Sequence, residues 1–268
     1  MCASPLSADW EPVPLHALPP LASECEAQAW LLPLDDPPLS HRTLADSLSP
    51  DERERAARFH FEHDRRRFEA ARGLLRWLLA QQARLAPAEI DFCLGDHGKP
   101  ALHPRHGDLH LSFNVSHSGP MALVGLMRGS TIGVDIELRR DVPEYEAIAA
   151  SNFAPEERRE LARLPSAQRL DAFFAGWTRK EAYIKAVGDG LHAPLDRFVV
   201  TVDPQQPPRL QSIAGSARAA AAWTLWAARA DAQAWAAVAV PRRGVRVRTF
   251  SLVSRPPEVG GPDTAVRS

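Results

Sequence analysis

The stretch TIGVDIELRR (131–140) places two carboxylates, Asp135 and Glu137, two residues apart. Apolar residues alternate with them, which is the period of a half-buried strand, so both acids project from one face. At about 3.3 Å per residue, their Cα atoms lie roughly 6–7 Å apart. A pair of acids held this close on a rigid strand could bind a hard cation. Taken singly, however, an Asp-x-Glu pair is also typical of the solvated outer face of a sheet.

A second candidate segment is FFAGWTRKEAYIKAVGDGL (173–191). On a helix, Phe173, Trp177 and Ile184 share one face, and Glu181 and Lys185 are neighbours one turn apart at its edge. Such a pair could supply a carboxylate and an ammonium group to a site. The alternative is a surface pair that stabilises the helix by a few tenths of a kcal/mol.

Three further segments carry polar or basic side chains that could contact an anion: FNVSHSGP (113–120), with Asn114, Ser116, His117 and Ser118; HGKPAL (97–102), with Lys99; and RFHFEHDRRRF (58–68). Taken singly, the first is a polar turn, the second an exposed loop lysine and the third a solvated helix face. A function is indicated only if the five segments meet.

The elements that would position these residues can be read from periodicity and punctuation. We expect a strand over 27–34, a helix that begins near Ser49 and Pro50, and a longer helix over 64–85. Three strands follow at 109–115, 121–127 and 131–138, then helices near 155–164 and 166–187, and strands within 196–240. No internal sequence repeat is evident. Runs of strands and runs of helices favour the α+β class.

Composition limits the classes of protein. The chain has 268 residues, 45% hydrophobic and 24% charged, with a formal net charge of −1. This charge gives no general attraction to nucleic acid or to an anionic membrane. Three scattered cysteines indicate neither a disulfide framework nor a zinc site. With no signal peptide or membrane span recognisable, we expect a cytoplasmic protein.

Together, the motifs SPDERERAARF, GKPAL, FNVSHSG, GVDIE and WTRKEAYIKAVGDGL resemble those of the 4′-phosphopantetheinyl transferase family, of the type that activates carrier domains of peptide and polyketide synthases. The order and spacing match over about 48–200. The resemblance implies two similar α+β halves related by a pseudo-twofold, with coenzyme A bound in the cleft between them. The expected halves are 1–125 and 126–245, followed by a tail, 246–268, that we expect to be disordered.

The resemblance also implies roles for individual residues. It assigns Mg²⁺ binding to Asp135, Glu137 and Glu181, in keeping with the preference of this cation for oxygen ligands. Glu181 would act as the general base, and Lys185 would reach the pyrophosphate and protonate the leaving 3′,5′-ADP. The remaining coenzyme A contacts would come from Arg55, Arg67, Lys99, Ser116 and His117. Two positions depart from some relatives: residue 52 is Glu rather than lysine, and residue 68 is Phe rather than a small hydroxyl residue.

The expected reaction transfers the 4′-phosphopantetheine arm of coenzyme A to a serine of an apo acyl or peptidyl carrier protein. The expected partners are therefore coenzyme A and the carrier, with no nucleic acid and no membrane, and the protein is expected to be a monomer. Two rival hypotheses remain: a coenzyme A-binding or carrier-binding protein without turnover, and a magnesium-dependent nucleotide hydrolase.

Overall fold

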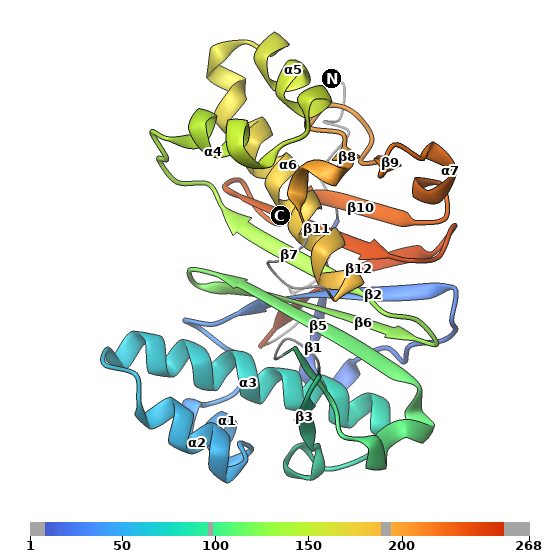
Figure 1. Cartoon of the computed structure of the whole chain (residues 1–268). Helices are drawn as coiled ribbons and strands as arrows, with labels where there is room; N and C mark the ends of the chain where they lie inside the picture. The colour runs from blue at the N-terminus through green and yellow to red at the C-terminus, as the bar shows by residue number, and fades with distance from the viewer. Residues whose placement is uncertain (1–8, 96–98, 189–193, 255–268) are drawn as a thin grey trace, which may run out of the picture.

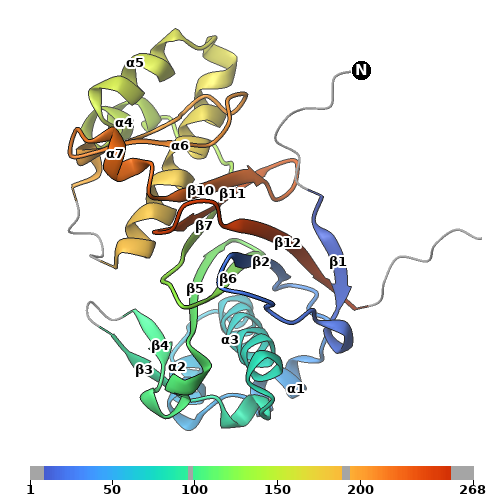
Figure 2. The same cartoon turned by 90° about the vertical axis from the view of Figure 1, so that its right-hand side faces the viewer.

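Two β-sheets lie face to face, and each is covered on its outer side by one long helix (Figures 1 and 2). The computed structural model describes residues 9–95, 99–188 and 194–254. The resulting order of layers is α3, first sheet, second sheet, α6. This order leaves the candidate residues of 113–118, 133–138 and 177–185 close to the junction of the two sheets.

The first sheet has five strands in the order β1-β12-β2-β6-β5, and the second has three in the order β10-β11-β7. Strands β1, β12 and β2 run parallel, and the other neighbours in both sheets are antiparallel. Two hairpins, β3–β4 and β8–β9, stand apart from these sheets. The bounds are β1 Glu11–Pro14, β2 Glu26–Pro33, β3 Phe92–Leu94, β4 Pro100–Leu102, β5 Leu111–Ser118, β6 Met121–Arg128, β7 Gly133–Leu138, β8 Phe198–Val200, β9 Leu210–Ile213, β10 Thr224–Arg229, β11 Ala234–Val240 and β12 Arg246–Val253.

The helices begin and end where the sequence supplies terminal signals. Proline is the first residue of α2, and Glu52 in its first turn accepts a hydrogen bond from the Ser49 N–H. Helix α6 ends at Gly188, whose φ of 92° suits a residue without a side chain. The bounds are α1 His41–Asp46, α2 Pro50–Ala57, α3 Glu62–Ala83, α4 Tyr145–Asn152, α5 Pro155–Arg163, α6 Ser166–Val187 and α7 Ala217–Ala220.

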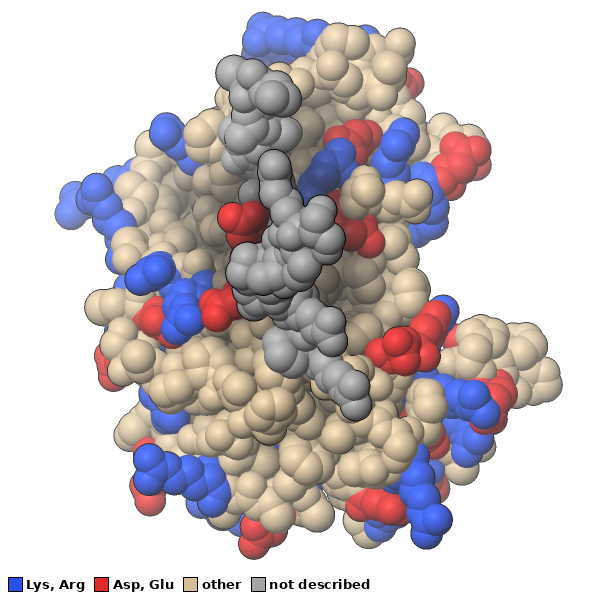
Figure 3. All heavy atoms as spheres, turned by 180° about the vertical axis from the view of Figure 1, so that it is seen from behind, with Lys and Arg blue, Asp and Glu red and all other residues tan. Residues whose placement is uncertain are grey.

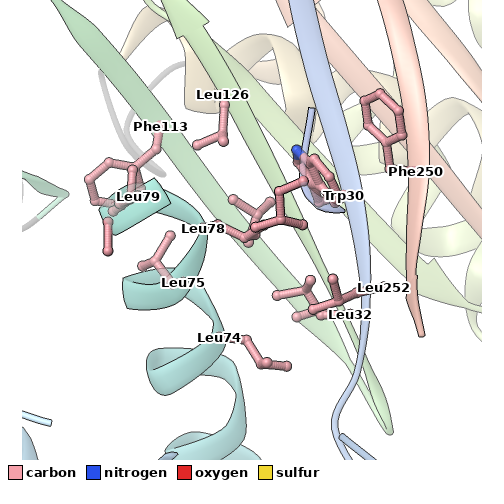
Figure 4. Packing of buried hydrophobic residues seen from close by; sticks show 14 of the residues in the cluster. Trp30, Leu32, Leu74, Leu75, Leu78, Leu79, Phe113, Leu126, Phe250 and Leu252 are labelled. Atoms are coloured by element: carbon pink, nitrogen blue, oxygen red, sulfur yellow. The ribbon is translucent and has the colours of Figure 1, made fainter. Parts of the chain in front are cut away.

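Hydrophobic clusters fill the spaces between the layers. Leucines of α3 point towards Trp30 of β2 and Phe250 of β12, whose rings stack with centroids 4.5 Å apart (Figure 4). Between the sheets, small and branched residues such as Ala29, Val134 and Val238 interdigitate. On the far side of the second sheet, alanines of β11 contact α6. Three apolar interfaces therefore hold four layers together.

The same order of elements occurs twice along the chain. In the first half, β2 is followed by three helices, a hairpin, and strands β5 and β6, and the order β2-β6-β5 forms within its sheet. In the second half, β7 is likewise followed by three helices, a hairpin with α7 after it, and strands β10 and β11, in the order β7-β11-β10. The α+β class is confirmed. A pseudo-twofold between the halves stays a prediction, as does the division at residue 125, which lies within β6.

The predicted C-terminal tail is wrong over Arg246–Val253. These residues form β12, which returns to the first sheet and pairs with both β1 and β2. Arginines at 246 and 248 hide its alternating pattern, while Phe250 and Leu252 are buried in the core. Residues 255–268 lie outside the described part of the chain.

The surface shows no gathering of one charge on the face seen in Figure 3, where acidic and basic side chains are interspersed. That face therefore carries no broad field that would attract a polyanion. None of the helices in the described ranges is both long and apolar enough to cross a bilayer.

Candidate active site

Strand β7 presents its two carboxylates to α6, as the alternation predicts. Val134 and Ile136 point into the cluster between the sheets, so Asp135 and Glu137 face the opposite way. Gly133 allows the strand to approach closely, because a Cβ there would come within 2.1 Å of the Ala182 carbonyl oxygen of α6. The strand and the helix that carry the candidate residues are therefore in backbone contact.

The Asp135 carboxylate is buried, with 3% of the residue exposed, and it is held from two sides. Its Oδ1 accepts hydrogen bonds from Lys185 Nζ at 2.6 Å and from Ser116 Oγ at 2.8 Å. Its Oδ2 is buried and has no hydrogen-bond partner. Burial raises the pKa of Asp135 to about 7, against the opposing effects of Lys185 and Ser116. A buried carboxylate oxygen without a partner is one that a ligand or cation would satisfy.

Glu137, two residues further along the same face, is less buried. Its Oε2 accepts a hydrogen bond from Ser118 Oγ at 3.1 Å and lies 3.5 Å from Arg140 Nη1. Its Oε1 has no partner among the described residues.

Glu181 and Lys185 lie one turn apart on α6, and both line the cavity that also contains Asp135 and Glu137. The Glu181 carboxylate makes no hydrogen bond or ion pair within the described ranges. Burial raises its pKa, with Glu137 acting in the same direction and Lys185 against it. A cavity of about 370 Å³ joins these side chains; its lining is Val115, Ser116, His117, Asp135, Glu137, Trp177, Glu181 and Lys185.

Three of the basic residues assigned to coenzyme A do not line this cavity. Lys99 donates a hydrogen bond to the Lys185 carbonyl oxygen at 2.5 Å, near the C-terminal end of α6, and burial lowers its pKa. Arg67 forms a double hydrogen bond with Asp35, at 2.6 and 2.8 Å, which lowers the pKa of Asp35. Arg55 is exposed and stacks on Phe68, with its guanidinium carbon 5.3 Å from the ring centre.

The strand predicted at 109–115 runs further than expected, because Ser116, His117 and Ser118 of the predicted polar turn are strand residues. Strand β5 continues to Ser118, so Asn114, Ser116 and Ser118 lie on one face and contact β7, while His117 is exposed and lines the cavity. Asn114 Oδ1 accepts a hydrogen bond from the Val134 N–H at 2.9 Å. The sequence interpretation assigned roles to Ser116 and His117 but none to Asn114 or Ser118. The N-x-S-x-S alternation was the signal that could have identified them.

Residue 52 is also explained by the structure. Glu52 is buried, with 4% exposed, and it accepts hydrogen bonds from Arg72 and Arg76 of α3. Its carboxylate holds α2 to α3, so it is not available to a nucleotide.

Comparison with known proteins agrees with this arrangement. Residues 37–126 match the family described as "4'-phosphopantetheinyl transferase, N-terminal", and residues 131–239 match the "4'-phosphopantetheinyl transferase superfamily". The chain is 40% identical over 215 residues to the 4'-phosphopantetheinyl transferase HetI of a Nostoc species, covering 80% of this chain and 87% of that protein. The chain belongs to the 4′-phosphopantetheinyl transferase family. It is an enzyme of this class.

Two further matches of this transferase have lower sequence identity. The 4'-phosphopantetheinyl transferase Sfp of Bacillus subtilis is 33% identical over 168 residues, covering 62% of this chain and 72% of Sfp. Among solved structures, the holo-[acyl-carrier-protein] synthase of Thermotoga maritima is 19% identical, with a TM-score of 0.32, and covers 42% of this chain and 64% of that one.

The carboxylates that line the cavity are suited to a cation whose remaining ligands are oxygens of the substrate. No three His, Cys, Asp or Glu side chains among the described residues are close enough to hold a metal ion by themselves. Asp135 Oδ2, Glu137 Oε1 and the Glu181 carboxylate are nevertheless unengaged, and all three side chains line one cavity. Mg²⁺ commonly binds one or two carboxylates and fills its other positions with water and substrate phosphate oxygens.

Proposed function

We propose that this chain transfers the 4′-phosphopantetheine arm of coenzyme A to a serine hydroxyl of an apo carrier protein and releases 3′,5′-ADP, with Mg²⁺ required. Membership of the family supports transfer from coenzyme A. The observation that supports the site is the meeting of Asp135, Glu137, Glu181 and Lys185 at one cavity, where Asp135 Oδ2 is buried without a partner.

Asp135, Glu137 and Glu181 would hold the cation, which supplies charge neutralisation at the pyrophosphate and polarises the phosphoryl oxygens. Without a cation, three carboxylates beside a pyrophosphate would repel it. Lys185 contributes a positive charge to the lining of the cavity. Its ammonium already contacts Asp135 and Ser116, so its position is fixed before substrate binds.

The chemical step forms a bond between the carrier serine Oγ and the phosphorus that bears the pantetheine arm, and it breaks the bond from that phosphorus to the bridging oxygen of 3′,5′-ADP. Glu181 accepts the serine proton. Its raised pKa moves it nearer to neutral pH, where a general base transfers protons best. Lys185 stabilises the charge that develops on the leaving oxygen and donates a proton to it.

The nucleotide end would be gripped by basic side chains outside the cavity. We assign Arg55 and Arg67 to the 3′-phosphate, because a guanidinium binds phosphate through two parallel hydrogen bonds. Arg67 would exchange Asp35 for the phosphate. Lys99, Ser116 and His117 complete the proposed coenzyme A contacts.

The decisive experiment measures the intact mass of several purified apo-carriers after incubation with coenzyme A and Mg²⁺. A gain equal to the phosphopantetheine arm is expected, and excess chelator should abolish it. Release of 3′,5′-ADP is measured in parallel, with and without carrier. Release without carrier would identify a nucleotide hydrolase, and coenzyme A binding without any mass gain on any carrier would identify a protein that binds without turnover.

A further inference from the structure

The two carboxylates of β7 are held in the same way, through contacts that the sequence did not predict. On Asp135, the Ser116 hydroxyl and the Lys185 ammonium both contact Oδ1, and Oδ2 is left without a partner. On Glu137, the Ser118 hydroxyl and the Arg140 guanidinium both contact Oε2, and Oε1 is left without a partner among the described residues. Each acid thus has one oxygen engaged by a serine and a cation and one oxygen unengaged.

The spacing of the two strands explains why this arrangement recurs. Strands β5 and β7 are edge strands of their sheets, and they meet side by side without sharing a backbone ladder. Side chains of β5 take the place of that ladder: Asn114 Oδ1 accepts from the Val134 N–H, and Ser118 Oγ accepts from the Leu138 N–H at 3.1 Å. Because both strands repeat every two residues, successive polar residues of β5 meet successive positions of β7.

Ser118 is the residue that combines the two kinds of contact. Its oxygen accepts a hydrogen bond from the β7 backbone, so its own hydroxyl proton is directed to the Glu137 carboxylate. The Arg140 contact is longer, at 3.5 Å, and its side chain is 63% exposed, so water weakens it. Ser118 is therefore the main constraint on the orientation of Glu137.

We propose that Ser118 is a positioning residue of the metal site, which fixes the Glu137 carboxylate so that Oε1 is presented to the cation. The inference rests on the proposed role of Glu137 as a ligand. Hydrogen-bond partners that orient a metal ligand typically contribute 10–100-fold to metal affinity. Because Ser118 is only half-buried, we expect a loss of about tenfold for Ser118→Ala, at the lower end of that range.

The test measures the affinity for Mn²⁺, a paramagnetic substitute for Mg²⁺, from the free Mn²⁺ signal in electron paramagnetic resonance with coenzyme A present. Ser112→Ala is the matched control, because Ser112 lies on the same face of β5 and makes no side-chain hydrogen bond within the described ranges. The dissociation constant should rise about tenfold in Ser118→Ala and stay near wild type in Ser112→Ala and in Ser118→Thr, which keeps the hydroxyl. Equal constants for Ser118→Ala and Ser112→Ala would overturn the proposal.

A double-mutant cycle decides whether Ser118 acts through Glu137. In a Glu137→Ala background, Ser118→Ala should cause no further loss of Mn²⁺ affinity, and a full additional loss would contradict the proposal. If Ser118→Ala fails to fold, Ser118→Cys is judged by the same criterion, since a thiol is a weaker donor of similar size. These measurements need no turnover. A wild type that binds Mn²⁺ but modifies no carrier would refute the proposed function and leave the role of Ser118 to the affinity comparison.

Discussion

Helix α6 carries two lysines, Lys180 and Lys185, on either side of Glu181. We expect the first to stabilise the fold and the second to act in the reaction, and matched substitutions can distinguish these two roles. Lys180 is completely buried. Its ammonium donates to both oxygens of Glu157, each at 2.7 Å, and to the Phe198 carbonyl at 2.9 Å. The Glu157 carboxylate also accepts the N–H groups of Ala154 and Val200. This network joins α5, α6 and β8.

Lys180→Met keeps most of the side-chain volume but leaves the Glu157 carboxylate buried without its cation. Removing one partner of a buried ion pair costs about 3–5 kcal/mol of unfolding free energy. For a chain of this size, that corresponds to a fall in Tm of about 10 °C, measured by circular dichroism. Burial already raises the pKa of Glu157, so its charged form is disfavoured in the fold. The loss should therefore be larger at high pH than at low pH, because the penalty disappears once Glu157 is protonated.

The comparison is Lys185→Met on the same helix. The side chain of Lys185 is 29% exposed. This substitution also removes the cation of a buried carboxylate, that of Asp135. The Tm should therefore fall as well, but less than in Lys180→Met, because Lys185 is partly exposed and Ser116 still donates to Asp135. Turnover should fall in Lys185→Met. Adding Glu157→Gln to Lys180→Met should recover part of the lost stability, because the buried charge is removed while an acceptor remains. The reasoning would be refuted by a Lys180→Met protein whose Tm stays within about 2 °C of wild type, or by a Glu157→Gln change that gives no recovery.

Three other outcomes follow from the site. Lys185→Met should reduce kcat by about 10²–10³ with a smaller change in coenzyme A affinity, because leaving-group charge develops in the transition state; steady-state kinetics with a carrier checks this. The Mg²⁺ concentration for half-maximal rate should fall as pH rises through about 7, because protons compete with the cation for the Asp135 carboxylate. In the metal-free protein, the free energy of unfolding should decrease as pH rises through about 7, because the raised pKa of Asp135 means that its neutral form stabilises the fold. Thermal unfolding of Asp135→Asn should lack this pH dependence. Arg67→Ala should raise the Michaelis constant for coenzyme A but not for 3′-dephospho-coenzyme A, and equal losses on both substrates would show that the 3′-phosphate lies elsewhere.

Alternation was the most informative signal in the sequence. It correctly placed Asp135 and Glu137 on one strand face, because the period of a strand depends only on local backbone geometry. It could not show that Lys185 would contact Asp135, since the two are 50 residues apart and meet only when β7 packs on α6. The same limit applies to Lys99: the sequence shows a loop lysine, whereas the fold directs its ammonium to the end of α6.

The repeated order of elements was also present in the sequence, in weak form. SPDERERAARF (49–59) and APEERRELARL (154–164) both place proline first in a helix and glutamate third. Each glutamate accepts the N–H of the residue before the proline and pairs with a cation of the long helix that follows: Glu52 with Arg76, and Glu157 with Lys180. The likeness is confined to this short segment, and the partner cation is arginine in one half and lysine in the other, so the sequence alone shows no repeat.

The candidate site residues lie on the first strand of the second half, β7, and not on β2, the matching strand of the first half. The positions of these two strands in their sheets explain this difference. Strand β2 is flanked by β12 and β6, so its helix-facing residues, such as Trp30 and Leu32, are enclosed and form core. Strand β7 is the edge of its sheet, with its free side towards β5. At an edge, backbone N–H groups lack ladder partners and side chains of the neighbouring half must satisfy them. Asn114 and Ser118 do so, and this polar contact between halves lets Asp135 and Glu137 occupy positions that are apolar in β2. The candidate active site therefore lies where one edge strand meets another, and there Asp135 Oδ2 is left without a partner among the described residues, so that a ligand could complete it.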